Sequence, residues 1–470
     1  MNSKELVLRI LRGSEKIVIR VNFCAHHYSI IPIVALTFLL LACAPREAGP
    51  PDAVTVPEGA AAPPYETISQ GDRARSDHER PSPTEEAIGA VITGMSLEER
   101  VGQLFMPAFW NDSRGNPVTS VNEEVRNVLR TVQPGGVVFF GVNIREPEQV
   151  RSFVEDLQQL ASHPLIVAVD QEGGVVDRLN SGDGMTASRF PSARRVGLTG
   201  DEDLAYEIGR ITARELRSLG ITMNFAPVAD VLTNSDNPAL RDRTFGDDPD
   251  HVARMVAATV RGLQDNGVAA VIKHFPGHGD TSYDSHYSAV TIPHSLDRLR
   301  SLEFIPFRAG FSAGAAGVMT AHISLPEIVG DLSPATLSPL LLRTVLREEL
   351  EYSGLVVTDS LAMVGVASGT GSTGDRSGLS LAAFQAGADI LLYPVDPVAD
   401  YQRLLDAVRD GTVSEEALDR SVRRILRAKF ELGLMVPPKS DALYEIPERF
   451  VPETLALGLP EHREVLSRVP

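Results

Sequence analysis

The chain has 470 residues, of which 43% are hydrophobic and 23% charged, a composition typical of a soluble globular protein. Its formal net charge of -18 excludes a general nucleic-acid binder, because binding to phosphates needs a basic surface. The chain has 2 cysteines, Cys24 and Cys43, so the remainder holds no disulfide framework, thiolate metal site or cysteine nucleophile.

Residues 1–43 have the pattern of a signal peptide. A basic stretch precedes an apolar run over residues 30–42, which is too short to span a bilayer comfortably as a helix. The run ends in Leu-Leu-Ala-Cys, which resembles a bacterial lipobox and implies lipidation at Cys43. An uncleaved membrane anchor is the alternative. Either way we expect an exported, membrane-anchored protein, and the lipobox indicates a lipoprotein of the bacterial cell envelope.

Residues 44–88 predict a flexible linker. This segment is rich in Pro, Ala, Glu and Ser. Prolines such as Pro63, Pro64 and Pro83 are expected to break any helix, and the segment has little to bury. We therefore expect a disordered, extended stalk between the leader and the folded domain.

From about residue 90, short apolar runs alternate with helical patterns. The expected strands cover residues 103–106, 136–140, 165–169, 222–225, 268–272, 317–321, 355–358 and 389–392. The expected helices cover residues 121–131, 146–160, 201–219, 249–266, 296–314, 338–350 and 379–387. Apolar strands separated by helices indicate a parallel sheet covered on both faces. Eight such units predict an α/β fold, a (β/α)8 TIM barrel over residues 89–436; an open doubly wound sheet is the alternative.

Polar residues come at the ends of several predicted strands. Asp170 follows the third strand, and Lys273 and His274 follow the fifth. His322 follows the sixth strand and Asp359 the seventh. A barrel places its catalytic residues at the carboxyl ends of its strands. We therefore expect these five residues to contribute to one active site.

The segment 273–286 is the richest in reactive side chains. Gly277 and Gly279 permit tight turns. Asp284 and His286 are two positions apart, so a turn can bring the carboxylate to the imidazole and create a proton-transfer pair.

Two other interpretations of this segment stay open from the residues alone. One is a polar loop whose histidines satisfy backbone groups. The other is a metal site, with His274, His278 and Asp280 as ligands.

Two further motifs carry candidate residues. Asp359, at the end of a buried strand, is either a nucleophile that forms a covalent glycosyl intermediate or the N-cap of the following helix. The segment 170–178 offers Asp170 as an acceptor for sugar hydroxyls and Arg178 as a supporting cation. The alternative is that segment 170–178 is an ordinary strand-to-helix turn. The polar loop that contains Arg243 follows the fourth strand, and by itself it is a weak indication of function.

These motifs resemble glycoside hydrolase family 3, and most closely its β-N-acetylglucosaminidase branch. The resemblance covers about residues 92–434 and is carried by K-H-F-P-G-H-G-D-T with D-S-H in segment 273–286, and by T-D-S-L-A-M from Thr358. It implies a retaining exo-acting enzyme that hydrolyses terminal N-acetylglucosamine from glycans. Peptidoglycan fragments of the cell wall are its expected carbohydrate substrate. It implies no metal and no cofactor.

The resemblance also implies a role for individual residues. Asp359 is expected to be the nucleophile, and His286 the general acid/base with Asp284 as its partner. The positions expected to bind substrate are Asp170, Arg178, Arg243, Lys273, His274 and His322. Two positions depart from the family pattern, with Val175 in place of the usual Arg and Asp177 in place of a frequent Gln. Both flank the expected sugar site and bear on fine specificity.

Alternatives to this metal-free hydrolysis follow from the same residues. A neutral imidazole does not repel an anionic acceptor, so phosphorolysis at this site is one of them. A non-catalytic glycan-binding surface lipoprotein and a metal-dependent hydrolase are the others. Residues 421–434 predict an amphipathic helix that closes the barrel domain. The tail, residues 437–470, resembles the start of a linker into a second domain.

Overall fold

The structure, a computed structural model, describes residues 4–12, 15–23, 82–282, 290–368, 376, 378–438, 442–452 and 454–469. The chain divides into two compact units, residues 1–76 and 77–470. In the first, β1 (Lys4–Arg12) and β2 (Glu15–Phe23) pair as an antiparallel hairpin. The expected apolar run and Cys43 lie outside the described residues. None of the helices in the described part of the chain is long and apolar enough to cross a membrane.

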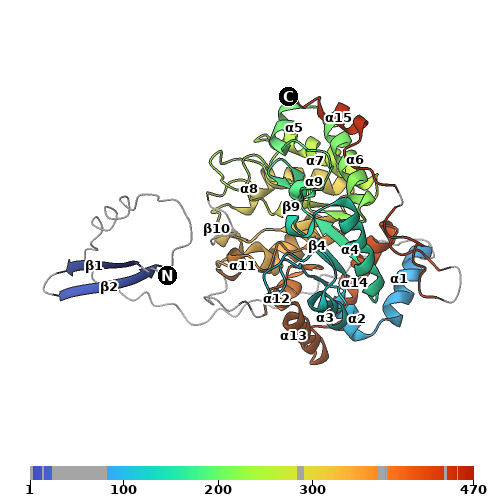
Figure 1. The fold of residues 1–470 in the computed structure, drawn as a ribbon, viewed down its shortest axis with the longest axis horizontal. Helices are drawn as coiled ribbons and strands as arrows, with labels where there is room; N and C mark the ends of the chain where they lie inside the picture. The colour runs from blue at the N-terminus through green and yellow to red at the C-terminus, as the bar shows by residue number, and fades with distance from the viewer. Residues whose placement is uncertain are drawn as a thin grey trace, which may run out of the picture. The chain divides into compact units, whose positions relative to one another are not determined.

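The second unit is built on eight parallel strands that alternate with helices (Figure 1). The strands are β3 (Phe105–Met106), β4 (Gly136–Phe139), β5 (Ile166–Val169), β8 (Met223–Asn224), β9 (Ala269–Phe275), β11 (Gly317–Thr320), β13 (Leu355–Val357) and β14 (Leu391–Leu392). Six of them form one curled sheet in the order β13-β11-β9-β8-β5-β4. The other two, β3 and β14, pair with each other. The predicted α/β class with a parallel sheet is confirmed.

Backbone contacts join the β3–β14 pair to both edges of the six-stranded sheet. On one side Ala108, just after β3, bridges Val138 of β4 in parallel. On the other side Val357 of β13 bridges Ile390, just before β14. The strands therefore follow one another in chain order around the sheet.

Helices cover the outer face of these strands. The principal ones are α3 (Glu123–Val132), α4 (Pro147–Leu160), α6 (Glu202–Ser218), α7 (Pro249–Gln264), α8 (Leu296–Ser301), α9 (Phe304–Ser312), the π-helix Leu340–Glu349, α12 (Leu379–Ala386), α13 (Pro397–Arg409) and α14 (Glu415–Glu431). Shorter elements are α2 (Leu97–Gly102), α5 (Ala193–Thr199), α10 (Pro326–Val329), α11 (Val364–Ser368), β6 (Gln171–Gly173), β7 (Val176–Asp177), β10 (Val290–Thr291) and β12 (Ile323–Ser324). Each predicted helix has a counterpart here.

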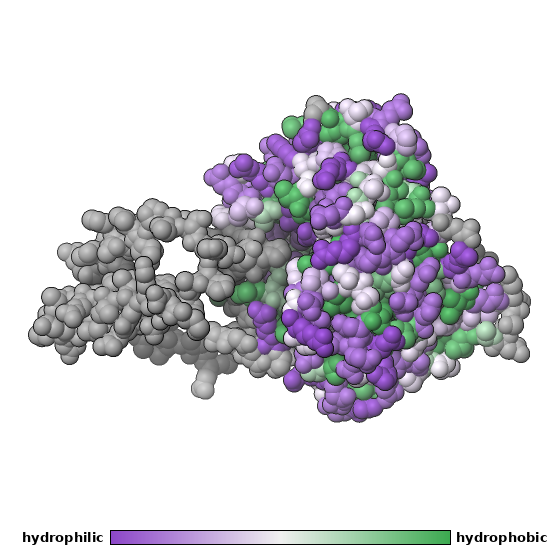
Figure 2. Space-filling view, in the orientation of Figure 1, coloured by the Kyte–Doolittle hydropathy of each residue, from purple (hydrophilic) through white to green (hydrophobic). Residues whose placement is uncertain are grey.

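The core lies between the strands and these helices. All four residues of β5 have no exposed surface, which explains why its sequence is a continuous apolar run rather than an alternating one. The visible outer face is largely hydrophilic, with apolar residues in small separate groups (Figure 2). The apolar residues of the strands are thus covered on both sides.

Two predictions of element boundaries are wrong, and the structure supplies the reasons. The expected helix 296–314 is interrupted between α8 and α9, because Pro306 has no N–H and its ring would clash with the carbonyl of Leu302 in a continuous helix. The fifth strand, β9, extends to Phe275, so Lys273 and His274 lie within it and not after it. Val228 bridges Lys273, which prolongs the pairing.

The predicted linker is also wrong over its last residues, because α1 (Pro83–Gly94) begins at Pro83. Proline is favoured in the first turn of a helix, where its missing N–H would have no partner in any case. Ser82 caps this end, since its hydroxyl accepts a hydrogen bond of 3.2 Å from the Glu85 amide. Ala87, Ile88, Val91 and Ile92 are buried. The folded unit therefore starts earlier than the composition suggested.

The tail after residue 436 belongs to the same compact unit. Its helix α15 (Pro460–Leu466) lies against α6, as Figure 1 shows at the C-terminal end. His462 Nδ1 lies 2.9 Å from Glu215 Oε1, and both side chains have no exposed surface. Glu215 also accepts hydrogen bonds from the Ser188 hydroxyl at 2.6 Å and the Gly458 amide at 2.9 Å. The tail is thus fastened to the domain by a buried polar cluster.

We expect His462→Ala to lower the free energy of unfolding by about 3 kcal/mol, because it leaves the Glu215 carboxylate buried without one of its partners. Chemical denaturation of the two proteins measures this difference. Glu464→Ala, an exposed change on the same helix, serves as the control and should shift stability by less than about 0.5 kcal/mol. Equal stability of His462→Ala and the wild type would show that the tail is not fastened in this way.

Candidate active site

An open cleft of about 1130 Å³ lies at the carboxyl ends of the parallel strands. It is lined by six of the residues predicted from the sequence: Asp170, Arg178, Arg243, Lys273, His274 and Asp359. They come from different strands, far apart in the chain, and the fold brings them together. The predicted pair Asp284 and His286 lies outside the described residues.

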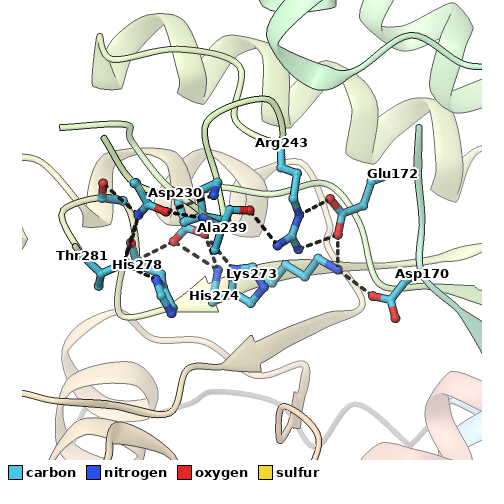
Figure 3. Close-up of polar contacts among 12 residues, drawn as sticks. Asp170, Glu172, Asp230, Ala239, Arg243, Lys273, His274, His278 and Thr281 are labelled. Carbon is cyan, nitrogen blue, oxygen red and sulfur yellow. Dashed lines mark hydrogen bonds and ion pairs between the residues drawn. The ribbon is translucent and has the colours of Figure 1, made fainter. Parts of the chain in front are cut away.

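A buried ion network forms one wall of the cleft (Figure 3). Lys273 Nζ lies 2.7 Å from Asp170 Oδ1 and 2.6 Å from Glu172 Oε1. Arg243 binds Glu172 with two nitrogens, Nε to Oε2 at 2.7 Å and a terminal nitrogen to Oε1 at 2.8 Å. Glu172 therefore joins the two cations, while the Asp170 side chain keeps 20% of its surface exposed towards the cleft.

The charges in this network stabilise one another. Burial raises the pKa of Glu172, but the charges of Arg243 and Lys273 outweigh burial and hold that pKa well below its usual range. Burial lowers the pKa of Lys273, but Asp170 and Glu172 raise it above its usual value. Both groups are therefore ionised at neutral pH. The wall presents one partly exposed carboxylate, Asp170, beside fixed cations, which suits the hydroxyl groups of a sugar.

A second buried carboxylate organises the segment after β9. Asp230 Oδ2 lies 2.7 Å from His274 Nδ1, and Asp230 Oδ1 accepts a hydrogen bond of 2.7 Å from the His278 amide. Burial raises the pKa of Asp230, but His274 and His278 lower it by more, so the group stays ionised. Because one nitrogen of His274 faces Asp230, the ring is fixed in orientation where it lines the cleft.

Glycine is needed at two positions of this segment for different reasons. Gly277 has φ of 129°, a conformation that residues with a side chain rarely adopt. At Gly279 the backbone passes so close to Val231 that a Cβ atom would lie 1.7 Å from the Val231 carbonyl oxygen. The expectation of tight turns holds for Gly277, and close backbone approach explains Gly279.

The structure gives the alternative metal ligands other partners. Asp280 Oδ2 lies 2.8 Å from His294 Nε2, and Asp280 Oδ1 accepts a hydrogen bond from Thr233. His278 Nδ1 lies 2.9 Å from the Thr281 hydroxyl. Within the described ranges, groups of three or more His, Cys, Asp or Glu arranged to hold a metal ion are not found.

Asp359 comes two residues after the end of β13 and lines the cleft. Its Oδ1 accepts a hydrogen bond of 2.7 Å from the Ser360 amide. The next helix, α11, begins only at Val364, so the alternative role of Asp359 as its N-cap is wrong. Asp359 and Ser360 instead form part of the cleft lining.

His322 differs from the expected substrate contact. It is 1% exposed and lies outside the cleft lining. Its Nε2 donates a hydrogen bond of 2.9 Å to the Ser360 carbonyl, and its Nδ1 lies 2.8 Å from the Thr336 hydroxyl. His322 therefore fixes the residue that follows Asp359, and the predicted pocket-lining role is corrected to a supporting one.

The β6–β7 hairpin presents Arg178. Gln171 Oε1 accepts a hydrogen bond of 2.9 Å from the Arg178 amide, and Gln171 Nε2 donates one of 2.9 Å to Asp177. The side-chain Nε of Arg178 is buried and has no hydrogen-bond partner among the described residues. Asp177, one of the two departures from the family pattern, thus shapes the hairpin, whereas Val175 is 73% exposed and outside the cleft lining.

Two residues of this site received no role from the sequence, Glu172 and Asp230. A signal existed for Glu172, because it stands two residues after Asp170 in an extended segment and so falls on the same side. Asp230 lies in an apolar stretch after the fourth strand, and a buried acid there must find a cation or several donors. Neither signal identifies the partner.

The pH dependence of stability should reveal His278. Burial lowers the pKa of His278 to about 4, below the ordinary value of 6.5. Between these two pH values the unfolded chain binds a proton that the folded chain does not, so stability falls as the pH falls. His278→Gln should remove up to about 3 kcal/mol of this decline.

Urea denaturation of both proteins between pH 4 and pH 7 measures the two slopes. Thr281→Val removes the hydrogen bond to His278 but no titrating group, so this control should keep the slope of the wild type. Identical slopes for the wild type and His278→Gln would contradict the shifted pKa.

Comparisons with known proteins agree with this geometry. Residues 96–428 match the family model described as "Glycosyl hydrolase family 3 N terminal domain". A "Beta-hexosaminidase A" of Pseudoalteromonas piscicida is 32% identical over 376 residues, which are 74% of this chain and 60% of that protein. A "Beta-hexosaminidase" of Stenotrophomonas maltophilia is 34% identical, and the match covers 64% of this chain and 87% of that protein.

A solved structure shares the architecture. It is that of a glycoside hydrolase family 3 β-N-acetylglucosaminidase from Paenibacillus, with a TM-score of 0.70 and 38% sequence identity. The match covers 80% of this chain and 68% of that one. The chain therefore belongs to glycosyl hydrolase family 3 and is a glycosidase related to the β-hexosaminidases.

Proposed function

We propose that the chain is a retaining exo-β-N-acetylglucosaminidase that removes terminal N-acetylglucosamine from glycans. The observation that carries the proposal is the joint presence in one cleft of Asp359 and the ion network around Lys273. A retaining glycosidase needs a carboxylate that attacks the anomeric carbon and groups that hold the sugar in place for this attack. The names of the relatives support an N-acetylhexosaminide as the substrate.

In this proposal Asp359 is the nucleophile. Its carboxylate attacks the anomeric carbon, the bond to the leaving oxygen breaks, and a glycosyl-aspartate ester forms. Water then attacks the same carbon from the other side and releases the sugar with its original configuration. His286, oriented by Asp284, gives a proton to the leaving oxygen and later removes one from the water, a role that the family resemblance supports.

The terminal sugar is bound by the wall of the cleft that holds the ion network. Asp170 accepts hydrogen bonds from sugar hydroxyls, and Lys273 and His274 donate towards their oxygens. Arg178 contributes a cation whose Nε still lacks a hydrogen-bond partner among the described residues. Arg243 acts mainly through Glu172, to which it binds with two nitrogens.

The fold in this proposal is a closed (β/α)8 TIM barrel. The succession of eight parallel strands supports it, together with the backbone bridges at Ala108 and Ile390 that join β3 and β14 to the sheet edges. A barrel explains why residues that follow different strands share one cleft.

We further propose that the protein is an exported lipoprotein of the bacterial cell envelope and acts on peptidoglycan fragments. The basic stretch, the apolar run over residues 30–42 and the sequence Leu-Leu-Ala-Cys support lipidation at Cys43. Incorporation of labelled fatty acid into the full chain that persists in Cys43→Ser would contradict this anchor.

The wild type should release 4-nitrophenol from the 4-nitrophenyl β-N-acetylglucosaminide, and proton NMR should show that the first sugar formed is the β-anomer. Asp359→Asn should lower kcat at least about a thousandfold, since it removes the nucleophile. Asp331→Asn changes an exposed carboxylate outside the cleft lining and should retain full activity.

Two outcomes would favour a different function, and a third would disprove the role of Asp359. Binding of glycans without turnover in the wild type, unaffected by Asp359→Asn, would indicate a glycan-binding lipoprotein. Release of the sugar 1-phosphate when phosphate is added would indicate phosphorolysis at the same site. Full activity of Asp359→Asn would disprove the assigned nucleophile.

A further inference from the structure

Three aromatic side chains line the part of the cleft that the ion network does not occupy. We call Trp110, Phe140 and Tyr393 the aromatic platform; all three line the cleft that also holds Asp170 and Asp359. The ring centroids of Trp110 and Phe140 are 4.8 Å apart, and those of Phe140 and Tyr393 are 5.8 Å apart. The three rings therefore form one continuous group.

The sheet order places the platform beside the ion network. Its residues come after β3, β4 and β14, the three strands that lie between β13 and β5 in the succession. Asp359 follows β13 and Asp170 follows β5. The platform thus occupies the remaining arc of the cleft, between the proposed nucleophile and the proposed sugar-binding wall.

The platform is held in place by the surrounding backbone. The Trp110 carbonyl accepts a hydrogen bond of 3.2 Å from the Val118 amide, which closes the loop between them. Asn143 donates a hydrogen bond to the Val118 carbonyl at 2.7 Å, and its Oδ1 accepts one from the Phe140 amide at 2.8 Å. Asn143 thus ties the loop of Trp110 to Phe140. A fixed surface loses little entropy when a ligand binds to it.

Tyr393 keeps its side chain in a backbone conformation that favours glycine. Its φ is 47°, in the left-handed region that residues other than glycine rarely adopt. The Tyr393 amide donates a hydrogen bond of 2.9 Å to the Met106 carbonyl, which fixes this conformation. Local strain of this kind is concentrated at functional sites.

The exposed face of Trp110 lacks a covering group among the described residues, since 42% of its surface is accessible. The faces of pyranose rings carry C–H bonds that pack against an aromatic ring, while their edges carry hydroxyl groups. An exposed, fixed aromatic surface beside hydrogen-bonding carboxylates and cations therefore suits a sugar ring.

We propose that the aromatic platform binds the second sugar ring of a β-linked oligosaccharide, on the leaving-group side of the scissile bond. This inference rests on the proposed exo-acting glycosidase: when the terminal sugar occupies the ion-network wall, every other ring of the substrate belongs to the leaving group. The platform is then a specificity-determining surface that favours oligosaccharides over substrates with small leaving groups.

The test compares two substrates of the full chain. One is the β-linked dimer of N-acetylglucosamine, whose leaving group is a sugar ring; the other is β-N-acetylglucosaminyl fluoride, whose leaving group has no ring. The measured quantity is the ratio of kcat/KM for the dimer to kcat/KM for the fluoride. Trp110→Ala should lower this ratio about tenfold, and Trp110→Phe should restore most of it.

Leu332→Ala removes an exposed apolar side chain outside the cleft lining and should leave the ratio unchanged. An unchanged ratio in Trp110→Ala would overturn the inference while the fluoride activity upholds the proposed function. If the wild type turns over neither substrate, the proposed function fails and the inference falls with it.

Fluorescence gives a second, independent readout, because Trp110 is the only tryptophan of the chain. In Asp359→Asn, binding of the dimer should change the tryptophan emission, whereas N-acetylglucosamine alone should change it much less. Binding of the dimer detected by calorimetry without any change of emission would contradict contact with the platform.

Discussion

The buried pairing of Lys273 with Glu172 and Asp170 is the interaction on which the rest of the site depends. A lysine whose side chain is 2% exposed cannot stay charged without anions at contact distance. Here it has two, at 2.6 Å and 2.7 Å, and Arg243 compensates the second charge of this group. Removing either partner would leave an uncompensated charge inside the protein. The network therefore constrains the positions of β5, β9 and the loop after β8 together.

A second constraint acts beside the first. Asp230 fixes His274 and the following turn, just as Glu172 fixes Lys273 and Arg243. Neither carboxylate needs to touch a substrate. Both carboxylates bind neighbouring groups of the protein through ion pairs and hydrogen bonds. The side chains that face the cleft are therefore oriented before a ligand binds. His322 does the same for the segment after Asp359 through the Ser360 carbonyl. Supporting residues thus hold Lys273, His274 and the segment after Asp359 in place.

The sequence predicted the strands and their polar ends well, because apolar runs and strand-end residues are local signals. It failed where an effect depends on a distant partner. Glu172 meets Arg243 71 positions away, and Asp230 meets His274 44 positions away, distances that no local pattern encodes. It also failed at prolines, because a proline can either begin a helix or interrupt one. Pro83 begins a helix in a segment whose composition predicted a linker. Pro306 interrupts a helix that the hydrophobic periodicity predicted to be continuous.

During turnover Asp359 should form a covalent bond to the sugar, and trapping this glycosyl-enzyme would reveal the bond itself. A β-N-acetylglucosaminyl fluoride with a second fluorine at C5 would be the probe, because the fluorine withdraws electrons from the positively charged transition state and slows breakdown of the intermediate. Mass spectrometry of the digested protein should then find the sugar on Asp359. Turnover of the probe with the label on another residue would contradict the account.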